Sequence, residues 1–112
     1  MTLKGSPFVT DADVEWVDAV PGVQRKVLCY DDGIMLARFA FQAGAVGPLH
    51  RHPHAQCSVV ESGVFDITIS GETRRLRAGD SYLVAPDALH GALAIEPGVL
   101  VDVFTPMRED FV

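Results

Sequence analysis

The sequence has few of the features that would place it in a membrane, in an oxidising compartment or on a nucleic acid. It contains only two cysteines, Cys29 and Cys57, whose spacing fits no CxxC pair or other metal motif, so we interpret them as reduced core or strand residues. No apolar run approaches the roughly 20 residues of a membrane helix, and residues 1–7 lack the apolar core of a signal peptide. The net charge is −6 and the longest basic run, residues 74–77, is short. We therefore expect a cytoplasmic protein with no membrane or nucleic-acid partner.

Helical periodicity is missing too, because no long segment repeats its apolar residues near every 3.6 positions. Short segments rich in valine, isoleucine, leucine and aromatic residues alternate instead with glycine, proline and aspartate turns, a pattern that predicts an all-β sandwich or barrel. The 112 residues fit a single domain, 1–112, with an N-terminal arm at 1–13. The predicted strands are 14–17, 23–30, 34–42, 57–61, 64–70, 73–77, 81–85, 89–95 and 99–105.

A histidine-rich stretch is the strongest chemical signal. His50 and His52 are two residues apart, so on an extended strand both rings point to the same face, and Gln56 lies a further even step along the chain. A lone histidine in a strand is usually structural, but this pair followed by Gln56 favours a metal site. His90 offers a fourth donor from a second strand-like segment. Nitrogen and oxygen donors of this kind accept one divalent ion, whether zinc, nickel, iron, manganese or cobalt. We place His54, beside a proline, outside the ligand set.

A charge also interrupts the apolar segment 99–104. Leu100, Asp102 and Phe104 share one face of this predicted strand, and three valines share the other. Asp102 is therefore either paired with Arg108 or another arginine for structural reasons, or a general acid/base in a cavity wall shaped by Phe104. Arg108 is either an exposed charge or a planar fork for a substrate carboxylate.

The histidine stretch resembles the first motif of the cupins, which are small jelly-roll (double-stranded β-helix) barrels. Five positions match that motif in type and spacing: Gly44, His50, His52, Gln56 and Gly63. The second motif is represented by Gly79 and His90, and this spacing carries most of the weight for His90. The chain departs from the second motif at three positions, having Pro86 shifted along the chain, Asp87 in place of a glycine and Ala94 in place of an asparagine. The resemblance spans roughly residues 23–105 and implies a cupin fold.

Among the cupins, the chain is most similar to the KdgF family of pectin-degradation proteins, in residues 21–28, in the histidine stretch and in residues 101–111. This resemblance implies ketonisation of 4,5-unsaturated monouronates from pectin or alginate, hence an isomerase or tautomerase acting on a small anionic sugar, and a homodimer. It implies metal ligation by His50, His52, Gln56 and His90. It also implies that Asp102, Phe104 and Arg108 complete the site, so that the tail 106–112 contributes to it. The loop before Gln56 is one residue shorter than is usual in that family.

The amide of Gln56 stands where most cupins have a glutamate. Three imidazoles and an amide leave the full charge on a divalent ion, which suits a Lewis acid that attracts an anionic sugar. Two other functions remain open: an iron dioxygenase, which would consume oxygen with its substrate, and a non-catalytic sugar-binding cupin, which would bind without turnover.

Overall fold

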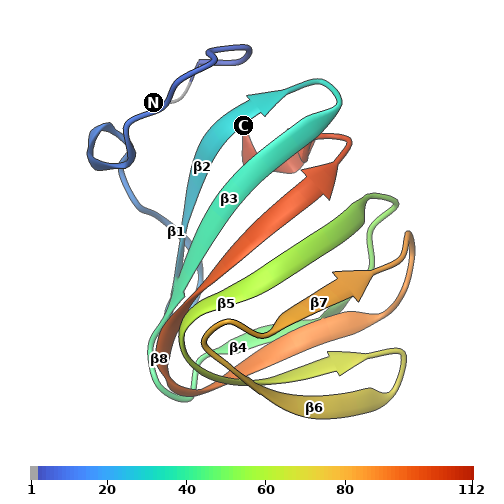
Figure 1. Ribbon diagram of the computed structural model, residues 1–112. Helices are drawn as coiled ribbons and strands as arrows, with labels where there is room; N and C mark the ends of the chain where they lie inside the picture. Colours follow the sequence, from blue (N-terminus) through green and yellow to red (C-terminus); the bar gives the residue numbers. More distant parts are fainter. Residues whose placement is uncertain (1–2) are drawn as a thin grey trace.

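The computed structural model describes residues 3–112, which form eight β-strands and two short 3₁₀ helices (Figure 1). Every strand pairing is antiparallel. In chain order the elements are η1 (Asp11–Asp13), β1 (Val17–Val20), β2 (Val23–Asp31), β3 (Ile34–Phe41), β4 (Val46–His50), β5 (Ala55–Ile69), β6 (Glu72–Arg77), β7 (Ser81–Val84), β8 (His90–Thr105) and η2 (Glu109–Phe111).

Two long strands, β5 and β8, run through the whole barrel and pair with each other over most of their length. Near its start β5 also pairs with β7, and near its end it pairs with β6. The first residues of β8 pair with β4, and its last residues pair with β3, which continues to β2 and β1. Each long strand thus belongs to two sheet layers. This arrangement is an all-β jelly roll, as the sequence predicts.

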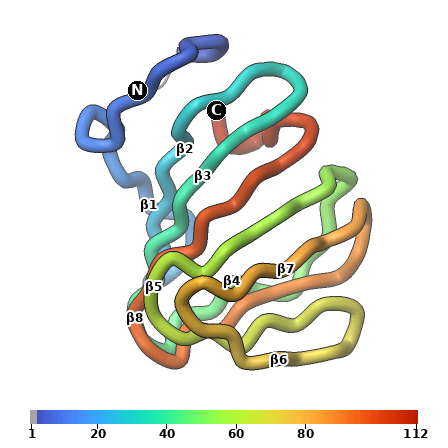
Figure 2. The backbone as a smooth tube through the Cα atoms, viewed as in Figure 1, coloured from blue at the N-terminus to red at the C-terminus, as the bar shows by residue number. Residues whose placement is uncertain are grey.

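The two long strands double back side by side, at the left of the view in Figure 2. At this corner β5 carries several register shifts between Val60 and Phe65, and Gly63 has a φ of +83°. A Cβ atom at Gly98 would lie 2.2 Å from the carbonyl oxygen of Ser62, so only glycine allows the two backbones to approach this closely. The predicted breaks between strands 57–61 and 64–70, and between strands 89–95 and 99–105, are therefore wrong: residues 62–63 and 96–98 are bulged corners within the continuous strands β5 and β8.

Other strand predictions have mixed outcomes. The predicted strands 23–30, 34–42, 73–77 and 81–85 are confirmed as β2, β3, β6 and β7 within one or two residues. The strand predicted at 14–17 is wrong, since the strand in this region is Val17–Val20 and Val14 is instead a buried residue that follows η1. The break predicted at Gly47 and Pro48 is also wrong, because both residues lie within β4. Among the described residues β4 pairs with β8 alone. Its other edge makes no strand pairing, so this edge strand tolerates a proline, which has no N–H donor.

The apolar core lies between the layers of the jelly roll. Phe41 from β3 and Phe65 from β5 meet edge to face at 5.2 Å between ring centroids, and both are buried. Around them pack Val23, Ala45, Val60, Ile67, Ala94 and Leu100. A second, smaller cluster contains Met35, Ala37 and Phe104. Phe104 belongs both to this core cluster and to the wall of a cavity.

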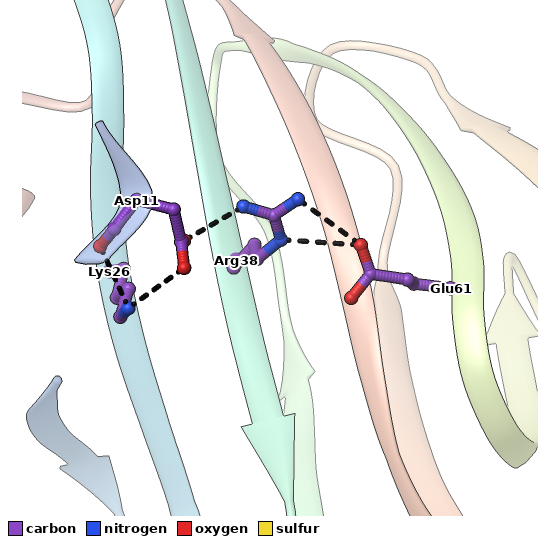
Figure 3. A network of polar contacts seen from close by, with 4 residues as sticks. All are labelled: Asp11, Lys26, Arg38 and Glu61. Atoms are coloured by element: carbon purple, nitrogen blue, oxygen red, sulfur yellow. Dashed lines mark hydrogen bonds and ion pairs between the residues drawn. The ribbon is translucent and has the colours of Figure 1, made fainter. Parts of the chain in front are cut away.

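The N-terminal segment is held against the outside of the barrel by a polar network (Figure 3). Lys26 of β2 donates to the backbone carbonyl of Asp11 at 3.1 Å and to its carboxylate at 3.3 Å. Arg38 of β3 bridges the Asp11 carboxylate, at 2.9 Å, and Glu61 of β5. These contacts tie the N-terminal segment to β2, β3 and β5. Lys26 is almost fully buried, and its charge therefore needs the partner that Asp11 supplies.

The two cysteines and the basic run lie on the surface. Cys29 and Cys57 are free, exposed strand residues. The basic run lies on β6, at one end of the strand order, where Arg75 pairs with Asp66. Within residues 3–112 no helix is long and apolar enough to cross a membrane.

Candidate functional site

Three histidines converge at one end of β4 and β8. His50 ends β4 and lies opposite His90, the first residue of β8, while His52 lies in the loop just after β4. Their potential ligand nitrogens all lie within 4.8 Å of one another. The expectation that His50 and His52 share a strand is thus wrong for His52, which is two residues beyond the strand end. Their predicted convergence with His90 is nevertheless confirmed.

The backbone orients all three rings in the same way. Nδ1 of His50 lies 2.8 Å from the carbonyl oxygen of Pro48, Nδ1 of His90 lies 2.9 Å from that of Ala88, and Nδ1 of His52 lies 3.0 Å from that of His54. A carbonyl oxygen only accepts, so each Nδ1 carries the proton and each Nε2 keeps a free lone pair. Nε2 of His90 is buried and has no hydrogen-bond partner. Three lone pairs directed at one point are the arrangement that a metal ion requires.

Gln56, near the start of β5, supplies a fourth donor atom. Its Nε2 donates to the hydroxyl of Ser58 at 3.0 Å, which turns its Oε1 toward His52. Oε1 and Nε2 of His52 are 3.1 Å apart. Since both atoms are acceptors in this tautomer, their approach is unfavourable unless a cation lies between or beside them. The one-residue-shorter loop therefore does not move Gln56 out of reach of the histidines.

His52 and His90 are held in the neutral form that metal binding requires. Burial lowers the pKa of His90 to about 4. Burial also lowers the pKa of His52, and the positive charge of Arg108 adds to this effect. His54 lies outside the cluster, as expected: its Nε2 donates to the carbonyl oxygen of Met107 at 3.1 Å, which ties the ligand loop to the C-terminal tail. The donor set fits one divalent ion held by three imidazoles and an amide.

A cavity of about 270 Å³ opens beside the cluster. Its volume is at the small end of known ligand sites, which suits a small molecule better than a polymer. Asp102, Phe104 and Arg108 all line it, together with the candidate ligands His50, Gln56 and His90. The structure thus brings the predicted site residues around one space; their individual roles remain predictions.

Asp102 is the buried carboxyl of this cavity. Its side chain points inward from β8 and is 6% exposed, and its Oδ1 has no hydrogen-bond partner. Burial raises its pKa to about 7, although a hydrogen bond from Ser58 and the charge of Arg108 act in the opposite direction. The structural alternative considered for Asp102, an ion pair with Arg108 or another arginine, is wrong, since no ion pair within residues 3–112 includes it.

Arg108 is not an exposed charge, because its side chain is almost entirely buried. Its Nε and Nη2 donate to the two carboxylate oxygens of Asp110, at 3.0 and 2.8 Å. Its guanidinium also lies 4.3 Å from the ring centroid of Phe111 and 5.1 Å from that of Phe104. Asp110 therefore already uses the pair of N–H donors, Nε and Nη2, with which Arg108 could hold a substrate carboxylate.

The model of the cupin domain matches residues 37–104, more than half of the chain. This chain is a cupin. It is 36% identical to the pectin degradation protein KdgF of Dickeya dadantii (strain 3937), over 93% of this chain and 96% of that protein. It is similar to a crystal structure of an RmlC-like cupin from Shewanella frigidimarina, with a TM-score of 0.94, 37% identity and 97% and 98% of the two chains covered. The structure of KdgF from a Halomonas species matches with a TM-score of 0.91, 36% identity and 96% and 99% coverage.

Three further residues of this cupin reach the site without having been predicted from the sequence. Ser58 links the ligand Gln56 to Asp102, which lies directly opposite it on β8. Phe111 of η2 and Arg25 of β2 line the cavity. For Ser58 the sequence holds no clear signal, and Phe111 was covered only by the expectation that the tail 106–112 contributes to the site. Arg25 did carry one, because it is a charge between Val23 and Val27 on an otherwise apolar strand face.

Proposed function

We propose that this cupin is a metal-dependent isomerase that ketonises 4,5-unsaturated monouronates released from pectin or alginate. The proposal rests mainly on one observation: a cluster of three histidines and Gln56 shares a small cavity with a buried carboxyl whose pKa is near neutral. Similarity over almost the whole chain to two proteins named KdgF, one described as a pectin degradation protein, supports the substrate class.

His50, His52, Gln56 and His90 would hold the metal ion. When bound, the ion would act as a Lewis acid that attracts and orients an anionic sugar. Imidazole and amide ligands carry no charge, so the protein does not cancel the charge of the ion. A substrate carboxylate and an oxygen that gains negative charge are both favoured in such a site.

The reaction is an isomerisation that needs no co-reactant. Opening of the sugar ring breaks the bond between C1 and the ring oxygen, and the C1 hydroxyl loses its proton to become an aldehyde. The former ring oxygen remains on C5 as an enol, which loses its own proton while C4 gains one, giving a ketone at C5. The net change is a movement of protons between oxygen and carbon, which a general acid/base can catalyse.

Asp102 would carry these protons. A carboxyl with a pKa near 7 is present in both protonation states at neutral pH, so it can accept a proton from oxygen and deliver one to carbon. Ser58 holds the carboxyl in place, and Phe104 forms an apolar wall that limits water in the cavity. Arg108 contributes positive charge at the same end of the cavity, with Nη1 left for a substrate oxygen because Asp110 occupies Nε and Nη2.

The proposal is tested by incubating metal-loaded and chelated protein with an unsaturated monouronate. We expect the metal-loaded form to remove the absorbance of the C4–C5 double bond faster than the spontaneous reaction, to yield the linear keto product by NMR, and to consume no oxygen. The variant with both His50→Ala and His52→Ala is the control: it should keep its β-rich circular dichroism and lose stoichiometric metal.

Two results would contradict the proposal. Oxygen uptake coupled to substrate loss without the keto product would indicate a dioxygenase. Binding of the sugar without turnover by the metal-loaded protein would indicate a sugar-binding cupin.

We also propose a homodimer, on the family resemblance alone; light scattering of the purified protein tests it.

A further inference from the structure

Two neighbouring cations on β2, Arg25 and Lys26, have opposite surroundings. Lys26 points outward and is fully partnered: it donates to Asp11 and lies 4.8 Å from the ring centroid of Trp16. Arg25 points inward, where it lines the cavity beside the metal cluster. No ion pair of residues 3–112 includes Arg25, and its buried Nε has no hydrogen-bond partner.

The guanidinium of Arg25 is only partly compensated for its lost hydration. Burial lowers the pKa of Arg25, which means that its charge is poorly solvated. The guanidinium stacks on the face of Phe111, with 4.1 Å between its central carbon and the ring centroid. Stacking offsets part of the lost hydration but satisfies none of the N–H donors, because the ring face offers no strong acceptor. A purely structural arginine would normally have a carboxylate or carbonyl partner.

The second arginine of the cavity, Arg108, differs in this respect. Its Nε and Nη2 are already used by Asp110, at 3.0 and 2.8 Å. Both guanidinium groups contact the ring of Phe111, so they lie at the same end of the cavity. That end therefore has one arginine that forms an ion pair with Asp110 and one, Arg25, that is attracted by the same carboxylate without a direct ion pair among residues 3–112.

We propose that Arg25 is the residue that recognises the substrate carboxylate, through a two-pronged contact that its unpaired guanidinium is free to make. The inference rests on the proposed function for its substrate class, a monouronate. Arg108 then has a different role, since its pairing with Asp110 fixes the tail and the ring of Phe111 against which Arg25 stacks. A planar guanidinium held on an aromatic face presents its N–H groups with little loss of freedom, which favours a planar carboxylate over a hydroxyl or an ester.

The test compares Arg25→Met and Arg25→Lys with two controls, Lys26→Met and Arg74→Met. Lys26 is the neighbouring cation with structural partners, and Arg74 is an exposed arginine of β6 outside the cavity. Turnover is measured with an unsaturated monouronate. Binding is measured by calorimetry with D-galacturonate and with its uncharged methyl ester, using metal-loaded protein throughout.

We expect Arg25→Met to raise KM at least about tenfold, the effect of losing one charge-assisted contact, and to reduce the preference of the wild type for galacturonate over its ester by a similar factor. Arg25→Lys should recover only part of both effects, because a point charge cannot replace the fork. Metal content should stay unchanged. The melting temperature of Arg25→Met should equal or exceed that of the wild type, since a half-buried charge without an ion-pair partner is removed, whereas Lys26→Met should melt lower and bind normally.

Wild-type KM and wild-type preference for the charged sugar in Arg25→Met would overturn the inference. Loss of metal, or a fall in melting temperature as large as that of Lys26→Met, would overturn it as well, by showing a structural role. Failure of the proposed function has a different signature. In that case the wild type shows no turnover. If galacturonate binding still depends on Arg25, the carboxylate contact of Arg25 is supported and the isomerase activity is rejected.

Discussion

At the scale of single residues, the chemistry of the site depends on which nitrogen of each histidine carries a proton. Backbone carbonyls of Pro48, Ala88 and His54 fix that choice for the three rings and leave every Nε2 free. Two of these carbonyls lie two residues before their histidine and one lies two residues after. The ligand geometry is therefore built from very local backbone, while the meeting of the three rings is a property of the fold.

Asp102 is the residue whose substitution separates chemistry from binding. Asp102→Asn keeps nearly the same shape and removes the proton carrier, so kcat should fall about 100-fold or more while KM changes little. Metal content should match that of the wild type, because Asp102 is not a proposed ligand. Loss of metal in this variant would instead make Asp102 a coordinating or structural residue, and the proton-transfer role would be abandoned.

The same variant has a predicted effect on stability. Because burial raises the pKa of Asp102 from 3.8 to about 7, folding favours the protonated carboxyl. The metal-free wild type should therefore lose stability as the pH rises from about 4 to about 7, whereas the contribution of an asparagine does not titrate. Denaturant unfolding of both metal-free proteins should show the difference growing in favour of Asp102→Asn over this range, and a difference independent of pH would contradict the buried, unpaired state of the carboxyl.

Residue types, their spacing and above all the resemblance to the KdgF proteins predicted one site formed by His50, His52, Gln56, His90, Asp102, Phe104 and Arg108, six of which line the cavity. They were insufficient for the partner of Arg108, because Asp110 is only one of several acidic residues near it in the chain. They were also insufficient for Arg25, which lies far from the other site residues in the sequence. Its proposed role depends on having no ion pair within residues 3–112, which is visible only in three dimensions.

At the scale of elements, the barrel depends on two strands that bend without ending. The sequence signals at Gly63 and Gly98 are those of turns, and the local interpretation of them as turns was wrong. The strands continue because each corner stays paired with the other, which is a non-local effect. By contrast, β2, β3, β6 and β7 end at tight turns whose signals are local, and these strands were predicted correctly.

The corner makes a prediction of its own. In Gly98→Ala the new Cβ would lie 2.2 Å from the carbonyl oxygen of Ser62 and 2.8 Å from the Cα of Gly63. The backbones must separate, so we expect a loss of about 3 kcal/mol in unfolding free energy. Gly33→Ala is the matched control, since nothing lies within 4 Å of the added atom. Equal stability of the two variants by denaturant unfolding would show that the corner is not close-packed.

At the scale of the whole molecule, the two ends of the chain have different roles. The N-terminal segment packs outside the barrel through Asp11, Lys26 and Arg38 (Figure 3). The C-terminal tail instead closes one side of the cavity. It is held by His54 of the ligand loop, which donates to Met107, and by the turn between β2 and β3, where the Met107 amide donates to Asp32 at 3.1 Å. Hydrogen bonds thus join the loop that carries the candidate metal ligands to the tail that lines the cavity.

The central claim is that the cavity delivers a proton to carbon, and solvent deuterium tests it most directly. Metal-loaded protein in D₂O should convert an unsaturated monouronate into a linear keto product with deuterium at one of the two C4 positions, because Asp102 approaches the sugar from a single side. The spontaneous reaction should also add one deuterium to each product molecule, but at either C4 position with equal frequency. If product forms with deuterium distributed equally over both positions, or no faster than without protein, the proposed ketonisation at this site is contradicted.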